Sequence, residues 1–415
     1  MNASALLKPL AAAALAVALS APASAADKHW VGTWSASPQA TWGTDFVLPT
    51  GTPPRLRDQT LRQVARVSVG GGRVRIALSN AYGAQPVTIG AARIALSAGG
   101  SRIDPSSDRV LSFGGQPGVT LPPGAPMLSD PVDLEVAALG EVAVSLYLPR
   151  DTAVQTFHWE GRQDAYLIAG DRTADAQLAR ADRLQTRPFL SGVYVESARP
   201  TRSVVILGDS ITDGAASTPN RYQRWPDLLA QRLAKRDIAV LNAGISGGQV
   251  LNDGMGVSAL ARFERDVLSL KPDTVFVLLG INDIGWPGSS FEPTREAMSA
   301  PRLIAGYRQL IARAHSHGVR IVGATLTPFE GALPDAPIHH YYNTDKDKVR
   351  QAVNAWIRDS GEFDAVVDFD AITRDPVHPQ RFLPAYDSGD RLHPGDAGYR
   401  AMAAAVDEAA LFGPR

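Results

Sequence analysis

The chain has 415 residues, of which 45% are hydrophobic and 20% are charged. These proportions are ordinary for a folded globular protein, and the length allows two or three domains. The formal net charge of −1 offers no basic field to nucleic acid, so we expect no nucleic-acid partner. The absence of cysteine excludes a thiol nucleophile and thiolate metal ligands, and a chain of this length can bury enough surface without disulfides.

Residues 1–25 are predicted to be a secretory signal peptide. Lys8 precedes a short apolar run, and Ala23-Ser-Ala25 fits an A-x-A cleavage site. The run is too short and too weakly flanked for a stable membrane span, although an uncleaved anchor is the alternative interpretation. No other uninterrupted apolar run approaches membrane length. We therefore expect export to the periplasm or the exterior, with no membrane span in the mature protein.

Residues 27–198 are predicted to form an all-β sandwich or jelly-roll-like domain. Apolar and polar residues alternate with a period of two in many short runs, which Gly, Pro, Asp and Ser clusters separate. Residues 174–183 could form a helix or a loop. The clearest predicted strands are Leu61–Val69, Arg73–Ser79, Val87–Gly90, Val142–Leu148 and Leu190–Val195.

Residues 200–415 are predicted to form an α/β domain. Short, β-branched, nearly all-apolar runs alternate here with amphipathic segments, a pattern typical of a parallel sheet covered by helices on both faces. The predicted strands are Ser203–Leu207, Ile238–Asn242, Thr274–Leu279, Val319–Leu326 and Ala365–Phe369. The predicted helices are Arg224–Arg236, Ser258–Leu270, Pro301–His317, Thr344–Ser360 and Asp396–Leu411.

Polar segments follow the first three strands of this predicted sheet. Ser210 follows the first strand, Asn242–Gly248 the second, and Gly280–Asp283 the third. In open parallel sheets, sites form beyond the carboxyl ends of the strands. Asp390 and His393 are three residues apart before the last helix, so one loop can hold both and return to the same edge. We expect these segments to meet at one rim.

These residue types indicate nucleophilic catalysis. A serine hydroxyl is a weak nucleophile at its free pKa and needs an adjacent base to take its proton. The base in turn needs a carboxylate that fixes its tautomer. Ser210, His393 and Asp390 supply these three groups.

The motifs resemble the blocks of the SGNH hydrolases, also called the GDSL esterase family. Gly208-Asp-Ser-Ile211 is similar to the first block, although Ile stands where Leu is usual, and the resemblance implies that Ser210 is the nucleophile. Asp390-Arg-Leu-His393 matches the Asp-x-x-His of the fifth block. The resemblance thus implies a triad of Ser210, His393 and Asp390.

The same resemblance implies an oxyanion hole and a fold. Gly247 resembles the glycine of the second block, and Gly280-Ile-Asn-Asp283 matches the third block. The implied oxyanion donors are the backbone N–H groups of Ser210 and Gly247 and the side-chain amide of Asn282. The resemblance covers about 200–415 and implies a flavodoxin-like three-layer α/β/α domain. The opening Val31–Pro38 also resembles bacterial members with an N-terminal β-domain.

Some neighbouring residues have other interpretations. Gly244-Ile-Ser-Gly-Gly248 satisfies the G-x-S-x-G elbow of α/β-hydrolases, which would make Ser246 the nucleophile. An elbow serine opens a helix, however, and the surrounding glycines disfavour a helix here. Asp209 and Asp283 are expected to order their loops rather than to react.

The histidines do not predict a metal site. His315 and His317 lie at a predicted helix end, where cations favour the dipole, and His339-His340 is a close pair. Neither pair has the H-E-x-x-H arrangement or carboxylates at metal-ligand spacing. His158 and Trp159 could belong to the sandwich core or face a sugar.

The predicted function is a secreted serine esterase that acts on short-chain carboxylic esters and needs no metal or organic cofactor. The substrate is a small-molecule or polysaccharide ester, with deacetylation of glycans as one case. Trp286, just past Asn282, could limit acyl length or stack on a sugar ring. Acyl transfer or thioester cleavage would use the same groups. The alternative from another class is a glycan-binding or structural protein with an inactive hydrolase domain.

Overall fold

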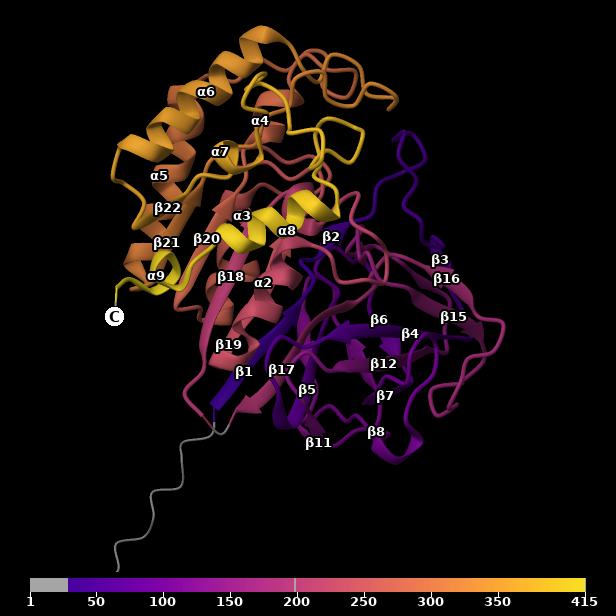
Figure 1. Ribbon diagram of the computed structural model, residues 1–415. Coiled ribbons are helices and arrows are strands. Elements are labelled where there is room, and N and C mark those ends of the chain that lie inside the picture. The colour runs from indigo at the N-terminus through magenta and orange to yellow at the C-terminus, as the bar shows by residue number, and fades with distance from the viewer. Residues whose placement is uncertain (1–28, 198, 415) are drawn as a thin grey trace, which may run out of the picture.

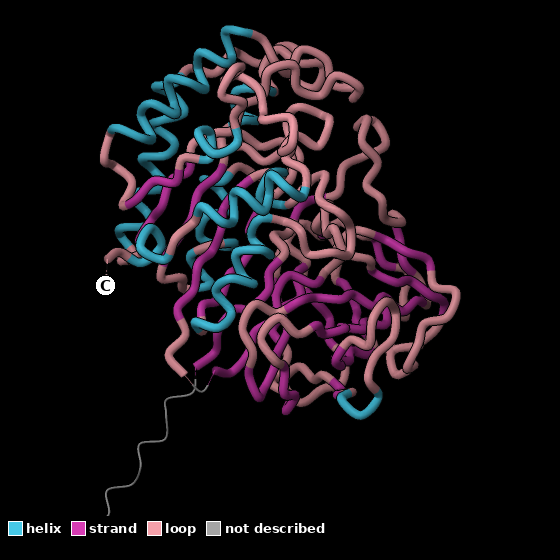
Figure 2. Tube along the Cα trace, in the orientation of Figure 1, coloured by secondary structure: helices cyan, strands magenta, loops and turns pink. Residues whose placement is uncertain are grey.

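The protein is described here from a computed structural model, which covers residues 29–197 and 199–414. The predicted signal peptide at residues 1–25 lies outside the described residues. Figure 1 shows a β-rich N-terminal half in indigo to magenta and an α/β C-terminal half in magenta-pink through orange to yellow. Figure 2 shows the same division, because nearly all helices gather in the C-terminal half.

Two antiparallel sheets dominate the N-terminal half. The first has the order β1-β17-β5-β10, with β11 also paired to β5. Its strands are β1 His29–Ser35, β17 Leu190–Ser197, β5 Gly71–Ser79, β10 Pro126–Leu128 and β11 Val132–Val136. The second has the order β16-β15-β4-β12-β7-β8. Its strands are β16 Asp182–Leu184, β15 Ala165–Ala169, β4 Gln59–Arg66, β12 Glu141–Leu148, β7 Ala91–Leu96 and β8 Arg109–Val110.

Short pairs and one turn of 3-10 helix complete this half. The pairs are β13 Thr152–Ala153 with β3 Arg55–Leu56, β14 Thr156–Phe157 with β2 Gln39–Ala40, and β6 Val87–Ile89 with β9 Val119–Leu121. The helical turn is η1 Pro105–Ser107.

The period-two pattern explains how these sheets bury a core. In β5, Val74, Ile76 and Leu78 are fully buried, while the intervening Arg73 and Arg75 keep partial contact with solvent. Side chains of a strand alternate between the two faces of its sheet. The predicted all-β N-terminal region is confirmed. The segment 174–183, predicted as a helix or a loop, is a loop that runs into β16.

The C-terminal half contains one parallel sheet. Its order is β19-β18-β20-β21-β22, and all its neighbours pair in parallel. Numbered along the chain, this is the 2-1-3-4-5 order of flavodoxin-like folds, so the predicted α/β fold class is confirmed. The strands are β18 Arg202–Gly208, β19 Ile238–Gly244, β20 Thr274–Leu278, β21 Arg320–Ala324 and β22 Ala365–Val367.

Helices cover both faces of this sheet. α2 packs with α8 on one face, while α3, α5 and α6 pack together on the other (Figure 1). The helices are α1 Ser210–Asp213, α2 Trp225–Leu233, η2 Ala234–Arg236, α3 Ala259–Asp266, η3 Leu268–Leu270, α4 Ile281–Gly285, α5 Ala300–Ser316, α6 Thr344–Asp359, α7 Phe369–Thr373, α8 Asp396–Ala405 and α9 Glu408–Phe412.

Several predicted boundaries in this half were wrong, and side-chain caps explain two of them. The single helix predicted over 396–411 is split into α8 and α9, because the Asp407 side chain accepts from the Ala410 N–H and starts a new helix. The strand predicted to reach Phe369 ends at Val367, where Asp368 caps α7 by accepting from Ala371 N–H. In both cases a side-chain cap starts a new helix at a point where the apolar pattern of the sequence continues without a break.

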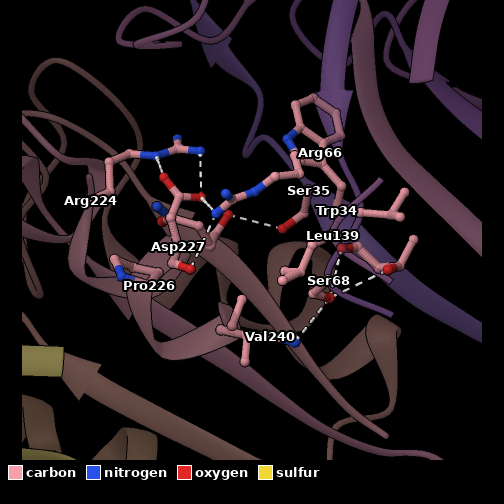
Figure 3. Close-up of a pocket in the computed structure, with 13 residues that line it drawn as sticks. Trp34, Ser35, Arg66, Ser68, Leu139, Arg224, Pro226, Asp227 and Val240 are labelled. Atoms are coloured by element: carbon pink, nitrogen blue, oxygen red, sulfur yellow. Dashed lines mark hydrogen bonds and ion pairs between the residues drawn. The ribbon is translucent and has the colours of Figure 1, made fainter. Parts of the chain in front are cut away.

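The two halves share one hydrophobic core. A continuous cluster of buried apolar side chains runs from β1 through both halves to α9. Strand β1 lies directly on β19, since a Cβ placed on Gly32 would stand 2.9 Å from the Leu241 side chain. Figure 3 shows the polar part of this junction, where the Val240 N–H donates to Ser68 Oγ at 3.1 Å. The β-rich half and the α/β half therefore pack on each other.

Within residues 29–197 and 199–414, no helix combines the length and the apolar character that a bilayer crossing requires.

Candidate active site

The three groups predicted to form a triad meet at the carboxyl end of the parallel sheet. Ser210 is the first residue of α1, directly after β18. His393 Nε2 lies 2.8 Å from Ser210 Oγ, and His393 Nδ1 lies 2.6 Å from Asp390 Oδ2. A carboxylate only accepts, so Nδ1–H donates to Asp390 and Nε2 accepts from the serine hydroxyl. The structure thus brings together residues 183 positions apart in the chain.

A tight turn holds both members of the Asp390/His393 pair. Asp390 Oδ1 accepts the backbone N–H groups of Leu392 at 2.9 Å and of His393 at 2.8 Å. The other carboxylate oxygen is thereby left for the imidazole. Arg391 sits at a φ of 63°, which bends the chain between the two side chains. Their three-residue spacing is what allows one carboxylate both to order the turn and to orient the base.

The electrostatics of this pair favour a charged Asp390 and a basic His393. Burial opposes the charge on Asp390, but the hydrogen bond and charge of His393 and the backbone N–H groups outweigh it and lower the pKa of Asp390 to about 2. Burial likewise lowers the pKa of His393. The hydrogen bond and charge of Asp390, with the nearby Glu160 and Asp209, outweigh that effect and raise the pKa of His393 above 6.5.

The turn before Ser210 is ordered by Asp209. Its Oδ1 accepts from the Ile211 N–H at 3.0 Å, so Asp209 caps α1 as expected for a structural aspartate. Burial raises the pKa of Asp209 to about 7, against the opposing effects of the Ile211 N–H and the His393 charge. Close packing also requires glycine at position 208, where a Cβ would stand 2.1 Å from Thr212 Oγ1.

Gly247 presents a free backbone N–H next to the site. Among the described residues, this N–H donates to no acceptor, although the following Gly248 N–H is bound to Ile245 O at 2.8 Å. Gly247 has a φ of 75°, and a Cβ there would stand 2.4 Å from Met255 Sδ. Only glycine fits this conformation and this space. We call residues 245–248 the oxyanion loop hereafter, after the role that the family resemblance implies for Gly247.

The amide of Asn282 is held in one orientation. Its Nδ2 donates to Gly248 O at 2.9 Å, and its Oδ1 accepts from the Tyr341 hydroxyl at 2.7 Å. The carbonyl of Gly248 requires a donor, so the amide cannot be flipped. An NH₂ group has two hydrogens, and one of them remains for another acceptor.

The residues beside Asn282 also support the oxyanion loop. Asp283 accepts the N–H groups of Val250 at 2.7 Å and Leu251 at 3.0 Å, which ties α4 to the segment after the loop. Burial raises the pKa of Asp283 to about 7, against these two backbone N–H groups. Trp286 Nε1 donates to Gly247 O at 3.3 Å. The indole is only 6% exposed and stacks on Phe291, so most of its surface is unavailable to a substrate.

Ser246, the alternative nucleophile, contacts carboxylates rather than an imidazole. Its Oγ lies 2.6 Å from Glu160 Oε2 and 3.0 Å from Asp213 Oδ2. No helix starts at Ser246, and the next helix is α3 at Ala259. The geometry around Ser246 therefore lacks the base that activates a serine.

His315 and His317, which the sequence places at a helix end, make polar contacts there. His317 is the C-cap of α5, and its Nδ1 lies 3.0 Å from Arg313 O. His315 Nε2 lies 3.0 Å from Asp364 Oδ2. Within the described residues, no group of three or more His, Cys, Asp or Glu side chains could hold a metal ion.

Sequence reasoning missed three residues that shape this rim. Buried Arg262 donates to Ala243 O at 2.7 Å and Gly208 O at 3.0 Å, which joins the ends of β18 and β19. Tyr341 orients Asn282, and Glu160 reaches Ser246 from the N-terminal half. Each acts across a long sequence separation, and an isolated Arg, Tyr or Glu has no local pattern that marks it.

Comparison with known proteins found similarities to this half of the chain. Residues 206–401 match the sequence model of the GDSL-like Lipase/Acylhydrolase family. The uncharacterized lipoprotein YqeF of Bacillus subtilis is 31% identical over 134 residues, which cover 31% of this chain and 50% of that protein, so the match spans half of that relative. An acetylxylan esterase of Geobacillus stearothermophilus is 26% identical over 219 residues, which cover 49% of this chain and 90% of that enzyme.

Solved structures similar to this chain carry related descriptions. A GDSL-like lipase from Bacteroides thetaiotaomicron is 21% identical and matches 50% of this chain and 87% of its own, with a TM-score of 0.38. The acetyl xylan esterase AlAXEase is 21% identical and matches 49% of this chain and 96% of its own, with a TM-score of 0.36.

Proposed function

We propose, from the premise that residues 206–401 of this chain belong to the GDSL-like lipase/acylhydrolase family, that the protein is a serine esterase. In this proposal, Ser210 is the nucleophile, His393 the general base and Asp390 the orienting carboxylate. The observation that carries it is the continuous chain from Ser210 Oγ through His393 to Asp390, with contacts of 2.8 and 2.6 Å. These distances lie within the reach that proton transfer requires.

The first half of the reaction forms an acyl-enzyme. Ser210 Oγ bonds to the ester carbonyl carbon while its proton moves to His393 Nε2. The negative charge that develops on the carbonyl oxygen is stabilised by the N–H groups of Ser210 and Gly247 and by the remaining N–H of Asn282. The carbon–oxygen bond to the leaving group then breaks, and His393 gives its proton to the departing alkoxide.

The second half releases the acid. His393 Nε2, neutral again, accepts a proton from water as the water oxygen attacks the acyl carbon. The same donors stabilise the second oxyanion, and the proton returns from His393 to Ser210 Oγ. Each cycle consumes one water, and these residues need no metal or organic cofactor to complete it.

We propose short-chain carboxylic esters, including acetyl groups on glycans, as the substrates. The support is the similarity to a protein named acetylxylan esterase. Small and polar residues on the segments near Ser210, in 212–218 and 287–290, also favour a small acyl group over a long chain. We further propose that the enzyme acts outside the cytoplasm, on the strength of the leader-like residues 1–25.

A release assay tests this function. Acetate release is measured from acetylated xylan and other acetylated glycans, alongside hydrolysis of p-nitrophenyl esters, for the wild-type protein and the Ser210→Ala variant. We expect hydrolysis by the wild type and none above background by the variant. No hydrolysis of any ester by the folded wild type would favour the alternative, a binding protein with an inactive hydrolase domain.

A further inference from the structure

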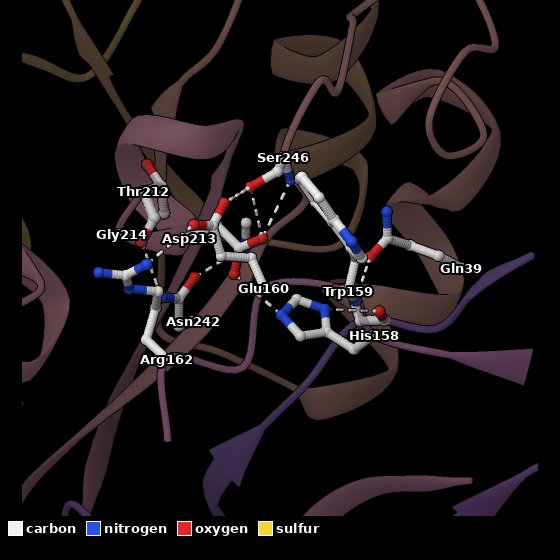
Figure 4. A network of polar contacts seen from close by, with 12 residues as sticks. Gln39, His158, Trp159, Glu160, Arg162, Thr212, Asp213, Gly214, Asn242 and Ser246 are labelled. Atoms are coloured by element: carbon white, nitrogen blue, oxygen red, sulfur yellow. Dashed lines mark hydrogen bonds and ion pairs between the residues drawn. The ribbon is translucent and has the colours of Figure 1, made fainter. Parts of the chain in front are cut away.

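The N-terminal half reaches the oxyanion loop with the segment that follows β14. From β14 the chain continues through His158, Trp159 and Glu160, and the side chains of His158 and Glu160 point toward Asp213 and Ser246 of the C-terminal half (Figure 4). Glu160 Oε2 lies 2.6 Å from Ser246 Oγ, although the two residues are 86 positions apart. Ser246 directly precedes Gly247, whose N–H is a proposed oxyanion donor.

The contacts of Ser246 require a shared proton. Its single hydroxyl hydrogen cannot satisfy both Glu160 Oε2 at 2.6 Å and Asp213 Oδ2 at 3.0 Å. Burial and the charge of Asp213 raise the pKa of Glu160, despite the Ser246 hydroxyl and the nearby Arg162. The Glu160 and Asp213 carboxyl groups therefore share a proton, with Ser246 Oγ held between them.

His158 holds the other oxygen of Asp213. His158 Nδ1 lies 3.1 Å from Ser37 O, and His158 Nε2 lies 2.9 Å from Asp213 Oδ1. Asp213 is 1% exposed, so a side chain of the N-terminal half reaches a buried carboxyl group of the C-terminal half.

The two carboxyl groups together hold Ser246 on both sides. Asp213 Oδ2 also accepts the Ser246 backbone N–H at 3.0 Å, so both the main chain and the side chain of Ser246 are fixed. Because Gly247 is the next residue, the direction of its N–H depends on the backbone of Ser246. The unbound Gly247 N–H described above is therefore aimed by contacts made through Ser246.

A second contact from the N-terminal half acts on the same loop. Gln39 Nε2 donates to Met255 O at 2.9 Å, and Gln39 Oε1 accepts from the Trp159 N–H at 2.8 Å. Met255 is the residue that packs against Gly247. Gln39 thus links the segment that carries Glu160 to the residue behind the oxyanion loop.

We propose that Glu160 is a positioning residue for the oxyanion hole, so that the N-terminal β-rich half is a working part of the active site. Glu160 touches no reacting atom; it acts through Ser246 on the N–H of Gly247. This inference rests on the proposed esterase function. It predicts that loss of the Glu160–Ser246 contact lowers transition-state stabilisation and leaves ester binding nearly unchanged.

The test uses the full-length protein and p-nitrophenyl acetate. The variants are Glu160→Ala, Glu160→Gln, Ser246→Ala and the double variant Glu160→Ala/Ser246→Ala. The matched control is Ser68→Ala, which removes another buried hydroxyl contact between the halves. In that contact, Ser68 Oγ accepts from the Val240 N–H of β19. Values of kcat are normalised to the active serine titrated with a fluorophosphonate, so that partial misfolding does not mimic a catalytic defect.

We expect Glu160→Ala to lower kcat by about tenfold and to change KM by no more than about twofold. This loss of kcat is smaller than the loss expected when an oxyanion donor itself is removed. Glu160→Gln should recover most of the activity, because its amide N–H can donate to Ser246 Oγ. Ser246→Ala should match Glu160→Ala, and the double variant should lose no more than either, since both remove the same contact. Ser68→Ala should keep the wild-type kcat.

Wild-type kcat in a folded Glu160→Ala variant would overturn the inference, as would losses that multiply in the double variant. If Glu160→Ala does not fold, the smaller Ser246→Ala change carries the test, and an unchanged kcat there overturns the inference. If the wild type is active and the variants are unaffected, the inference about Glu160 is wrong and the proposed function is untouched. If the folded wild type is inactive, the proposed function is wrong, and so is the inference that rests on it.

Discussion

The hydroxyl of Tyr341 donates to Asn282 Oδ1 at 2.7 Å and so determines, with Gly248 O, which way the Asn282 amide points. Both side chains are buried, with Tyr341 1% and Asn282 2% exposed. Tyr341 belongs to the loop before α6, whereas Asn282 belongs to α4. A proposed oxyanion donor is therefore oriented by a residue that comes 59 positions later in the chain.

Asn282→Ala and Tyr341→Phe should weaken the oxyanion hole to different degrees. Asn282→Ala removes a donor and should lower kcat by about 10²–10³. Tyr341→Phe keeps the donor but removes one hydrogen bond worth about 1–1.5 kcal/mol, so kcat should fall by roughly tenfold. Steady-state kinetics on p-nitrophenyl acetate measure both. A folded Asn282→Ala variant with wild-type kcat would exclude Asn282 from this role.

Activity should fall at acid pH as His393 becomes protonated. The base must be neutral to accept a proton, and the surrounding carboxyl groups raise the pKa of His393 above 6.5. The pH profile of kcat/KM should therefore lose activity as pH falls through a pKa above about 6.5. Asp209→Asn should move this acid limb to lower pH, because it removes one of the charges that raise the pKa of His393. A flat profile between about pH 5 and 8 would argue against a histidine base.

Asp390→Asn should both slow the reaction and move the acid limb. Without the carboxylate, the imidazole loses its orienting acceptor and the stabilisation of its charged form, so kcat should drop by on the order of 10³–10⁴. The same change removes the charge that raises the pKa of His393, so the remaining activity should persist to lower pH. A limb that stays in place would show that Asp390 does not set the pKa of the base.

Short acyl groups should be the preferred substrates. Trp286 and Met255 pack behind Gly247, and the nearby segments 212–218 and 287–290 are small or polar. Measured kcat/KM along a p-nitrophenyl ester series should be highest for acetyl and propionyl esters and low beyond about eight carbons. An optimum at the long end would contradict this expectation.

Trp286→Ala should shift that optimum toward longer chains if the indole limits acyl length. The 6% of Trp286 that is exposed is the part of the indole that could contact an acyl chain. The hydrogen bond from Trp286 Nε1 to Gly247 O supports the oxyanion loop. A lower kcat for every ester, with an unchanged chain-length profile, would show that Trp286 supports the oxyanion loop and does not limit acyl length.

The alternation of strands and helices and the position of Ser210 after a strand could be predicted from the sequence, because both depend on local patterns. Apolar runs mark the parallel strands, and a rule about parallel sheets then places the residues that follow them at one edge. Asp390 and His393 could be paired because their spacing fits one turn. The proximity of this turn to Ser210 came from the family resemblance and from the returning last helix.

The supporting residues could not be predicted in this way. Glu160 lies in a different half of the chain from Ser246, and the packing of the two halves on each other brings the two residues together. The apolar pattern of 396–411 likewise gave no sign of the break at Asp407, since a single capping side chain ended one helix and began the next. Contacts between distant segments and competing caps are the features that a local pattern does not contain.

The most direct test of the central claim is the site of fluorophosphonate labelling. The full-length protein is treated with the probe, and peptide mapping by mass spectrometry locates the adduct. We predict one adduct, on Ser210, that disappears in Ser210→Ala and persists in Ser246→Ala. An adduct on Ser246, or a folded wild-type protein that takes no label, would contradict the assignment of Ser210 as the activated nucleophile.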